Sequence, residues 1–404
     1  MPTDLERPPA SGDDAPDTVA AAERLLSRWC GASVRLTDPE DLGGSVRSVV
    51  LRVRVAENPF SLPRTLVIKR SVAPPVADEP DTFSHEAASC QLLTAVQPAD
   101  PVGPELIAHD PDQRLLVMED LGRAATLAEK LLGADPRAAE RGLLAWARSL
   151  GRLHAVTAGR EADFGALMRR LGTRTWHDPI APDARRALAD LPDLLAAELG
   201  VPTDHATARR ARTSVRLLGG PGYRAFSPSD LCPDNNLVTN HGVRFLDFEW
   251  GCIRDVTLDV AFLRMPFPSC WCVFRLPAGM ADAMLAAWRA EIVDVWPALG
   301  DDSVLMPRLL DAQMLWTWLS TWSLLPRGGE ADSPIDAVEG AKGSSPYRGA
   351  ALADRWERLA EHCAADEPAV AVHATAVAAA LRKRFEVPDP ALPPYPAFRA
   401  KAAS

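Results

Sequence analysis

The sequence predicts an α+β protein with two lobes, a small β-rich amino-terminal lobe over residues 18–120 and a larger, mostly helical carboxy-terminal lobe over residues 121–404. With 404 residues, of which 47% are hydrophobic, the chain is long enough to bury a sizeable core in two lobes. Short strand-like runs alternate with one helix-like run between Ser33 and about Ala108, whereas apolar residues recur at helical spacing over most of the later chain. Residues 1–17 are rich in Pro, Asp and Ser and are expected to form a disordered tail.

The amino-terminal lobe begins with an amphipathic helix over Val19 to Gly31, which is followed by a turn that contains glycine. In this turn Gly43, Gly44 and Ser45 lead into an alternating strand over Val49 to Val55. Glycine lets a backbone approach a ligand such as a phosphate closely, so these three residues are candidates for nucleotide binding. The turn lacks the full Gly-x-Gly-x-x-Gly pattern, and by itself it is weak support for a phosphate site.

A lysine and a glutamate come next, in the order in which the elements of a kinase nucleotide site follow one another. Lys69 lies in the apolar strand Thr65 to Arg70, and Glu86 lies in the helix-like run from Phe83 to Leu93. A lysine in such a strand can reach the α- and β-phosphates of a nucleotide, and a helix glutamate can hold it by an ion pair. Taken singly, each residue has an alternative interpretation as an exposed surface charge.

A buried strand then runs into a linker over Arg114 to Gly122, where the two lobes are expected to meet. Backbone groups of such a hinge can bind the edge of an adenine ring, so Met118, Glu119 and Leu121 are further candidates for nucleotide binding. The next helix, Arg141 to Thr157, carries an apolar stripe, and its His154 is interpreted as a packed residue and not as a ligand.

The most informative stretch contains Asp230 and, five residues later, Asn235. Transfer of a γ-phosphoryl group needs a carboxylate beside the attacking hydroxyl and oxygen ligands for Mg²⁺. Asp230 is therefore the candidate catalytic base or hydroxyl-orienting group, and Asn235 is a candidate magnesium ligand. Asp and Asn also cluster at ordinary turns, so the spacing alone has little specificity.

A hairpin follows the loop, because two short apolar strands flank a turn at Asn240-His241-Gly242. Asp247 comes at the end of the second strand. This is the place of a metal-binding Asp in the Asp-Phe-Gly element of kinases, so Asp247 is the second candidate magnesium ligand.

The order of these elements, from about Asp41 to about Arg264, resembles the aminoglycoside phosphotransferase and choline kinase-like family. The resemblance implies a bilobal protein kinase-like fold, ATP or GTP as phosphoryl donor, Mg²⁺ as cofactor and a small molecule with a hydroxyl group as acceptor. It also implies that Asp255 and Asp259 are the structural acidic pair of the family, of which the second usually braces the catalytic loop. The family loop usually reads His-Gly-Asp, whereas here Pro228 and Ser229 precede Asp230.

Two other classes of protein are alternatives to a kinase. The change at Pro228 and Ser229 leaves open a catalytically silent pseudokinase that binds a nucleotide or a protein partner. An α/β-hydrolase-like enzyme is disfavoured, because the chain has no Gly-x-Ser-x-Gly motif.

Charge and cysteine content limit the partners and the compartment. The formal net charge of -10 argues against nucleic acid and anionic membranes as partners, and no stretch is apolar enough for a membrane span or a signal peptide. Seven cysteines without a Cys-x-x-Cys motif favour a reducing, cytoplasmic setting, and Cys270-Trp271-Cys272 is interpreted as packing and not as half of a zinc site. The sequence gives no signal for an oligomeric state.

The acceptor site is expected between the catalytic loop and the carboxy-terminal helices, which the periodicity places at 281–296, 305–325 and 350–385. Candidates for its wall are four tryptophans, although residues at this spacing are more often core: Trp271, Trp316, Trp318 and Trp322. Four acidic residues of a loop between two of these helices could line its mouth, or could simply be solvated: Glu330, Asp332, Asp336 and Glu339.

Overall fold

The computed structural model describes residues 14–44, 48–57, 62–72, 80–96, 100–173, 176, 178–265, 267–268, 270–328, 331–333, 335 and 346–399. The chain divides into two compact units. The first contains the chain up to Ala124 together with residues 162–176 and 244–251. The second contains residues 125–161, 177–243 and 252–404. The segment that carries Asp247 therefore belongs to the same unit as the amino-terminal strands.

The first unit is built on a five-stranded antiparallel sheet with the strand order β1-β2-β3-β5-β4. Its strands are β1 (Arg35–Asp41), β2 (Ser48–Glu57), β3 (Thr65–Ser71), β4 (Leu106–Asp110) and β5 (Leu115–Glu119). Side chains alternate between the two faces of a strand, and on β2 the alternate residues Val49, Leu51 and Val53 are buried. On β3, Lys69 is paired with Val50 of β2 and Leu116 of β5, which places it inside the sheet and not at an edge.

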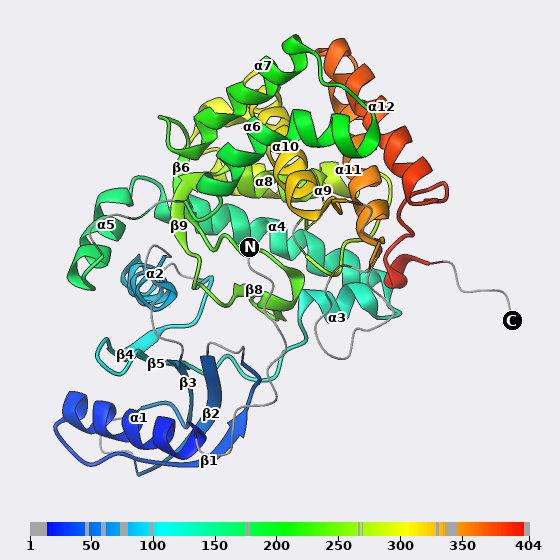
Figure 1. Ribbon diagram of the computed structural model, residues 1–404. Coiled ribbons are helices and arrows are strands. Elements are labelled where there is room, and N and C mark those ends of the chain that lie inside the picture. Colours follow the sequence, from blue (N-terminus) through cyan, green and yellow to red (C-terminus); the bar gives the residue numbers. More distant parts are fainter. Residues whose placement is uncertain are drawn as a thin grey trace, which may run out of the picture. The chain divides into compact units, whose positions relative to one another are not determined.

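Helix α1 (Asp14–Cys30) lies along this sheet (Figure 1), and Ala22, Leu25 and Leu26 pack into one core with the strands. The helix begins at Asp14, inside the stretch expected to be a disordered tail. Ala15 packs against the same core, which explains why the helix starts before residue 18. The other helices of this unit are α2 (Thr82–Val96) and α5 (Glu161–Arg170).

The second unit is mostly helical. Its helices are α3 (Leu127–Leu132), α4 (Pro136–Thr157), α6 (Ala181–Leu199), α7 (His205–Thr213), α8 (Thr257–Arg264), α9 (Met280–Ile292), α10 (Asp302–Leu324), α11 (Arg348–Cys363) and α12 (Pro368–Arg384). Two small sheets interrupt the helices. One pairs β6 (Arg224–Ser227) with β9 (Cys252–Asp255), and the other pairs β7 (Asn236–Thr239) with β8 (Gly242–Phe245) as the hairpin predicted from the sequence.

Helix α10 forms the centre of the second unit and packs against α6, α8 and α11. Apolar residues lie all around it, as is typical of a helix that is buried on every side. Helix α4 packs along α9 and begins with Pro136 after Asp135, whose side chain accepts hydrogen bonds from the first free backbone N–H groups.

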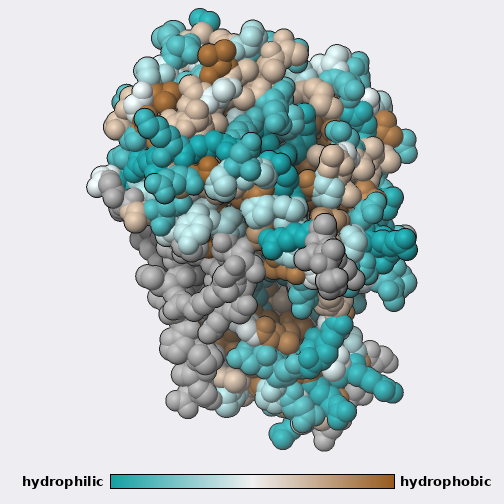
Figure 2. Space-filling model, turned by 90° about the vertical axis from the view of Figure 1, so that its right-hand side faces the viewer, coloured by the Kyte–Doolittle hydropathy of each residue, from teal (hydrophilic) through white to brown (hydrophobic). Residues whose placement is uncertain are grey.

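The α+β prediction is confirmed, since a sheet dominates one unit and helices dominate the other. The helix expected over 350–385 is instead two helices, α11 and α12. Pro368 starts α12, and a proline is tolerated in the first turn of a helix but not in its interior. On the face shown in Figure 2, hydrophilic residues predominate and hydrophobic residues lie between them. Among the described helices, none combines the length and the apolar character that a membrane span would need.

Candidate active site

Three of the predicted residues meet in the first unit. Lys69 comes from β3, Glu86 from α2 and Asp247 from the segment after β8. The Lys69 Nζ atom lies 2.8 Å from Glu86 Oε1 and 2.6 Å from Asp247 Oδ1. Lys69 and Asp247 are 178 residues apart in the chain, so the fold and not local sequence brings them together.

The ammonium group of Lys69 is held in its charged form. Burial alone would lower the pKa of Lys69, but the negative charges of Asp247, Glu86 and Glu249 raise it well above its ordinary value. The side chains of Lys69 and Glu86 are nearly buried, whereas the side chain of Asp247 is 35% exposed. A fixed cation thus sits beside a carboxylate that solvent or a ligand can reach.

Asp247 adopts a left-handed backbone conformation with φ of 59°. Asp enters this region more readily than most residues other than glycine, although at some cost in free energy. The same segment is held to the unit by the Phe245 N–H, which donates to Val102 O at 2.7 Å, and by His85 Nδ1, which lies 2.8 Å from Gly251 O. The position of Asp247 is therefore fixed on both sides.

The predicted glycine turn follows β1. Gly43 has φ of 84°, and its N–H donates to Asp41 Oδ1 at 2.9 Å. A side chain at Gly44 would collide with Ser48 O, because a Cβ there would lie 2.1 Å from that oxygen. Both glycines are thus required by the turn itself, whatever it binds. Ser45 lies outside the described residues.

The predicted hinge residues lie at the end of β5. Met118 is buried and paired with Val67 and Leu106, and the Glu119 N–H donates to Glu105 O at 2.8 Å. Leu121 follows the strand and is partly exposed. The structure places Met118 and Glu119 at the end of β5 and Leu121 in the segment that follows it.

The other two predicted residues meet in the second unit. Asn235 Nδ2 donates to Asp230 Oδ2 at 3.1 Å, and the Cys232 N–H donates to Asp230 Oδ1 at 3.0 Å. The loop closes as a short 3₁₀ turn over Pro233–Asn235. These contacts orient the carboxylate of Asp230 and leave it partly exposed.

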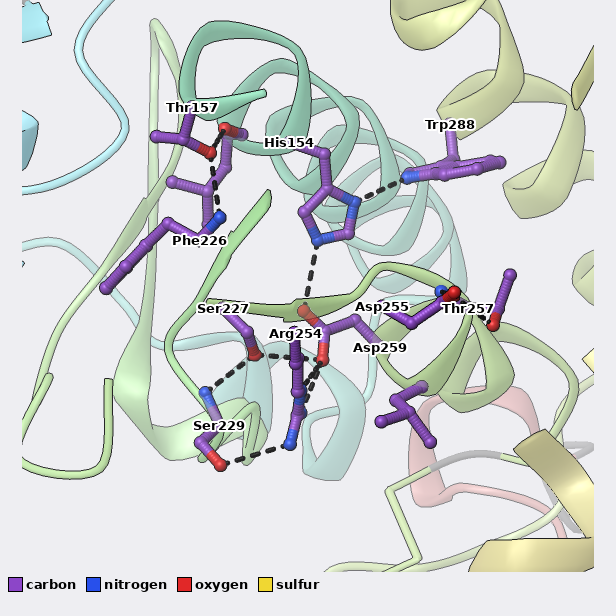
Figure 3. A network of polar contacts seen from close by, with 12 residues as sticks. His154, Thr157, Phe226, Ser227, Ser229, Arg254, Asp255, Thr257, Asp259 and Trp288 are labelled. Atoms are coloured by element: carbon purple, nitrogen blue, oxygen red, sulfur yellow. Dashed lines mark hydrogen bonds and ion pairs between the residues drawn. The ribbon is translucent and has the colours of Figure 1, made fainter. Parts of the chain in front are cut away.

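Beneath this loop lies a buried polar network centred on Asp259 of α8 (Figure 3). Ser227 Oγ donates to Asp259 Oδ1 at 2.9 Å, and Arg254 Nε donates to the same oxygen at 2.8 Å. His154 Nε2 lies 3.0 Å from Asp259 Oδ2, and its Nδ1 accepts from Trp288 Nε1 at 3.0 Å. Burial would raise the pKa of Asp259, but the charge of Arg254 and the contact with His154 together lower it.

The network reaches the loop of Asp230 through two serines. The Ser229 N–H donates to Ser227 Oγ at 2.9 Å, and Arg254 Nη1 donates to Ser229 Oγ at 3.1 Å. Ser229 stands where the family that the sequence resembles usually has glycine, and its φ of 66° is one that glycine adopts without strain. The two hydrogen bonds stabilise serine in this conformation, so the altered loop keeps a defined shape.

The four tryptophans proposed for the acceptor wall differ in their surroundings. Trp316 donates from Nε1 to Leu258 O at 2.8 Å and Trp318 packs on Trp356, so both are buried core residues, as the alternative interpretation held. Trp322 is partly exposed on α10 beneath Arg327. Of the acidic loop residues only Asp332 is described, and Glu330, Asp336 and Glu339 lie outside the described residues.

Trp271 contacts the loop that carries Asp230 and Asn235. Its Nε1 donates to Asp234 Oδ2 at 3.1 Å. Asp234 was not singled out from the sequence, although its place beside Asn235 offered a signal.

The sequence also gave no sign of the disulfide between Cys232 and Cys270, because the two cysteines are 38 residues apart and belong to no motif. The interpretation of Cys270 as simple packing is therefore wrong, whereas Cys272 is a buried free thiol as expected. The disulfide joins the loop of Asp230 to the segment of Trp271.

No protein-family model matches the chain, and no curated protein matches it. Among solved structures, the chain is similar to a choline/ethanolamine kinase family protein from Mesorhizobium loti, with 17% identity, a TM-score of 0.44, and coverage of 91% of this chain and 99% of that chain. It is also similar to choline kinase from Cryptosporidium parvum, with 13% identity, a TM-score of 0.44, and coverage of 94% and 98%. A putative aminoglycoside phosphotransferase from Ralstonia eutropha has 13% identity, a TM-score of 0.44, and coverage of 90% and 98%.

These proteins carry the names of the family that the sequence resembles.

Proposed function

We propose that the protein is a small-molecule kinase that transfers the γ-phosphoryl group of ATP or GTP to a hydroxyl group of a small acceptor, such as an antibiotic, an aminosugar or an aminoalcohol. The observation that carries the proposal is the cluster of Lys69, Glu86 and Asp247, because a buried lysine held between two carboxylates from distant segments is a costly arrangement for a merely structural role. The separately ordered pair of Asp230 and Asn235 supplies the second half of the chemistry.

In the first unit, Lys69 would bind the α- and β-phosphates, and Glu86 would hold its ammonium group in place. Gly43, Gly44 and Ser45 would cover the phosphates, and backbone groups of Met118, Glu119 and Leu121 would bind the base. Since the pKa of Lys69 is raised, the cation is present throughout the neutral range.

Asp247 and Asn235 are suitable ligands for Mg²⁺, because this ion prefers oxygen atoms and a carboxylate and an amide both provide them. When bound, the ion would neutralise charge on the transferred phosphoryl group. The proposal requires both residues to act on the same nucleotide.

Asp230 would accept the proton of the acceptor hydroxyl as that oxygen attacks the γ-phosphorus, or orient the hydroxyl for attack. Its carboxylate is already oriented by the Cys232 N–H and by Asn235, which reduces the reorganisation needed at that step. A kinase is favoured over a silent pseudokinase because Ser229, one of the two altered positions, is held by its own hydrogen bonds in the conformation expected of glycine.

The proposed setting is a reducing compartment such as the cytoplasm, where disulfides are rare and Cys232 and Cys270 would be two thiols.

The function is tested by measuring consumption of ATP and of GTP with Mg²⁺ over a panel of aminoglycosides, aminoalcohols, sugars, nucleosides and macrolides. Turnover that depends on one acceptor and is lost in Asp230→Asn would support the proposal. Nucleotide binding without turnover for any acceptor would favour the pseudokinase. Absence of nucleotide binding would overturn the kinase and leave only a pseudokinase that binds a protein partner.

Substitution of Asp247 by alanine is expected to abolish Mg²⁺-dependent nucleotide binding, because it removes the carboxylate ligand while Lys69 keeps its ion pair with Glu86. Isothermal titration calorimetry with and without Mg²⁺ measures this effect. Asp112→Ala, at an exposed acid of the same unit, serves as the control and should bind normally. Undiminished binding by Asp247→Ala would contradict its role as a metal ligand.

Substitution of Lys69 by methionine is expected to raise the nucleotide KM by about tenfold or more, since a hydrogen bond to a charged group is worth about 1.5–3 kcal/mol. Steady-state kinetics with varied nucleotide concentration measures the change. Lys130→Met on α3 is the matched control. Unchanged kinetics in Lys69→Met would show that this lysine does not contact the nucleotide.

A further inference from the structure

The two cysteines of the disulfide and the catalytic carboxylate lie together in the second unit. The sulfur atoms of Cys232 and Cys270 and a carboxylate oxygen of Asp230 all lie within 4.8 Å of one another. The proposed phosphoryl transfer uses Asp230 but gives no role to either cysteine. Two sulfur ligands and one oxygen ligand are a set that a thiophilic metal ion binds.

We propose that reduction of the Cys232–Cys270 disulfide creates a three-ligand metal site, formed by Cys232, Cys270 and Asp230. This site would bind a thiophilic divalent metal ion such as zinc. An ion bound there would occupy the catalytic carboxylate and stop phosphoryl transfer. This last consequence rests on the proposed function, whereas metal binding itself does not.

The spacing of the three side chains suits such an ion. Zinc lies about 2.3 Å from a thiolate sulfur and about 2.0–2.2 Å from a carboxylate oxygen in tetrahedral geometry, which puts its ligand atoms about 3.6–3.8 Å apart. The present cluster already falls within 4.8 Å, and the Cα atoms of the two cysteines are 5.6 Å apart. Once the S–S bond is broken, rotation about the Cα–Cβ bonds moves the sulfurs to the distance required.

Two well-held segments supply the ligands. The Cys232 N–H donates to Asp230, and the Cys232 carbonyl accepts from the Asn235 N–H at 3.0 Å, so the first cysteine is fixed by the catalytic loop. The Cys270 N–H donates to Phe267 O at 3.0 Å, and the next residue, Trp271, is bonded to Asp234 of the loop. That second link persists after reduction and keeps the two sulfurs near each other.

Exposure and chemistry distinguish this pair from the other thiols. Asp230 and Cys232 are partly exposed, which gives an ion a route to the site, whereas Cys270 is buried. Cys272, two residues further on, is fully buried and does not belong to the cluster of Asp230, Cys232 and Cys270. Mg²⁺, which prefers oxygen ligands, would not compete for a site with two sulfurs.

The redox state decides whether the site exists. A phosphine reductant breaks the S–S bond with one water molecule, giving two thiols and one phosphine oxide. Binding of the divalent ion then forms two metal–sulfur bonds and one metal–oxygen bond and releases the two thiol protons to solvent. The oxidised chain has no thiol at either position and cannot form the site.

The test uses the full chain, with cobalt(II) as a spectroscopic substitute for zinc. The protein is first reduced with a phosphine, and the phosphine is then removed in the absence of air. The reduced protein is titrated with Co²⁺, and binding is measured by the sulfur-to-cobalt charge-transfer band in the near ultraviolet. We expect one ion per chain, displaced by Zn²⁺, and no band from the oxidised protein. The band should be lost or strongly reduced in Cys232→Ser and in Cys270→Ser but kept in Cys30→Ser, a free cysteine of the other unit.

Asp230→Asn should keep the charge-transfer band but bind the metal about tenfold or more weakly, because the two sulfurs remain and the charged oxygen ligand is lost. The proposal would be overturned by equal cobalt spectra for oxidised and reduced protein, or by a full band in Cys232→Ser. It would also be overturned if reduced protein gave no band while its circular dichroism spectrum showed that it was folded. In the kinase assay, micromolar Zn²⁺ added to reduced enzyme in excess Mg²⁺ should inhibit, and a chelator should restore activity. If no kinase activity is found, the cobalt result still stands or fails by itself.

Discussion

Replacing Asp230 by asparagine should lower kcat by about 10²–10⁴-fold, the contribution typical of a positioned acid or base, and should change nucleotide affinity little. Asparagine has the same shape and can still accept from the Cys232 N–H, but it cannot take up the proton of the acceptor hydroxyl. The interaction that is lost acts only in the transition state, so the loss appears in kcat and not in binding. Steady-state kinetics together with calorimetry of nucleotide binding separates the two quantities.

Asp183→Asn, at a surface acid of α6, is the matched control and should behave as the unchanged protein. Retention of full activity in Asp230→Asn would show that Asp230 is not the base. A fall in nucleotide affinity as large as the fall in kcat would instead mean that Asp230 helps to form the nucleotide site through its hydrogen bond with Asn235.

The ordered motifs of the first unit are visible in the sequence because each residue lies in a short element of clear periodicity. Lys69 falls in an apolar strand and Glu86 in a helix, and the order of such elements predicts both the sheet and the pairing of those residues. Local patterns of this kind depend on neighbours along the chain, so a single sequence contains them.

Other parts of the site depend on contacts between distant segments and leave no trace in local spacing. The disulfide joins residues 38 positions apart, and His154 meets Asp259 across 105 positions. His154 showed only the helical spacing of a packed residue, and its polar partners appeared with the fold. The tryptophans of α10 are a different case, because their spacing is visible in the sequence but has two interpretations. An aromatic stripe could line a pocket, and it is also expected of a helix that is buried on all sides.

Acid should weaken the protein partly through Asp259. Its pKa is lower in the folded state than the value of about 3.9 expected for the unfolded chain. The stabilisation that it provides is therefore complete above the unfolded-state pKa and is lost as the pH falls through the folded-state value. The free energies of unfolding of the unchanged protein and of Asp259→Asn can be measured with urea between pH 7 and pH 3. We expect the difference between the two proteins to become smaller as the pH falls toward 3. A difference independent of pH would mean that the charge of Asp259 is not what stabilises the fold.

At neutral pH, Asp259→Asn should lower the free energy of unfolding by about 3–5 kcal/mol, the range for breaking a buried ion pair by removing one partner. The amide leaves the guanidinium of Arg254 as a buried charge without its closest counter-charge, and Arg254 is 1% exposed. Asp178 lies 3.7 Å from the Arg254 guanidinium, which is too far to replace the lost hydrogen bonds. Chemical denaturation followed by circular dichroism measures the loss.

Asp255→Asn provides the matched comparison, because Asp255 is also buried but pairs with Arg308, whose side chain is 23% exposed. Water can solvate Arg308 after the substitution, so the loss in Asp255→Asn should be smaller than in Asp259→Asn. Similar losses of unfolding free energy in the two variants would mean that the burial of Arg254 adds nothing to the effect of the substitution. The network of Figure 3 would then hold the loop through its serine hydrogen bonds instead. In that case Ser227→Ala, which removes the hydroxyl shared by Asp259 and the Ser229 N–H, should destabilise the protein as much as Asp259→Asn does.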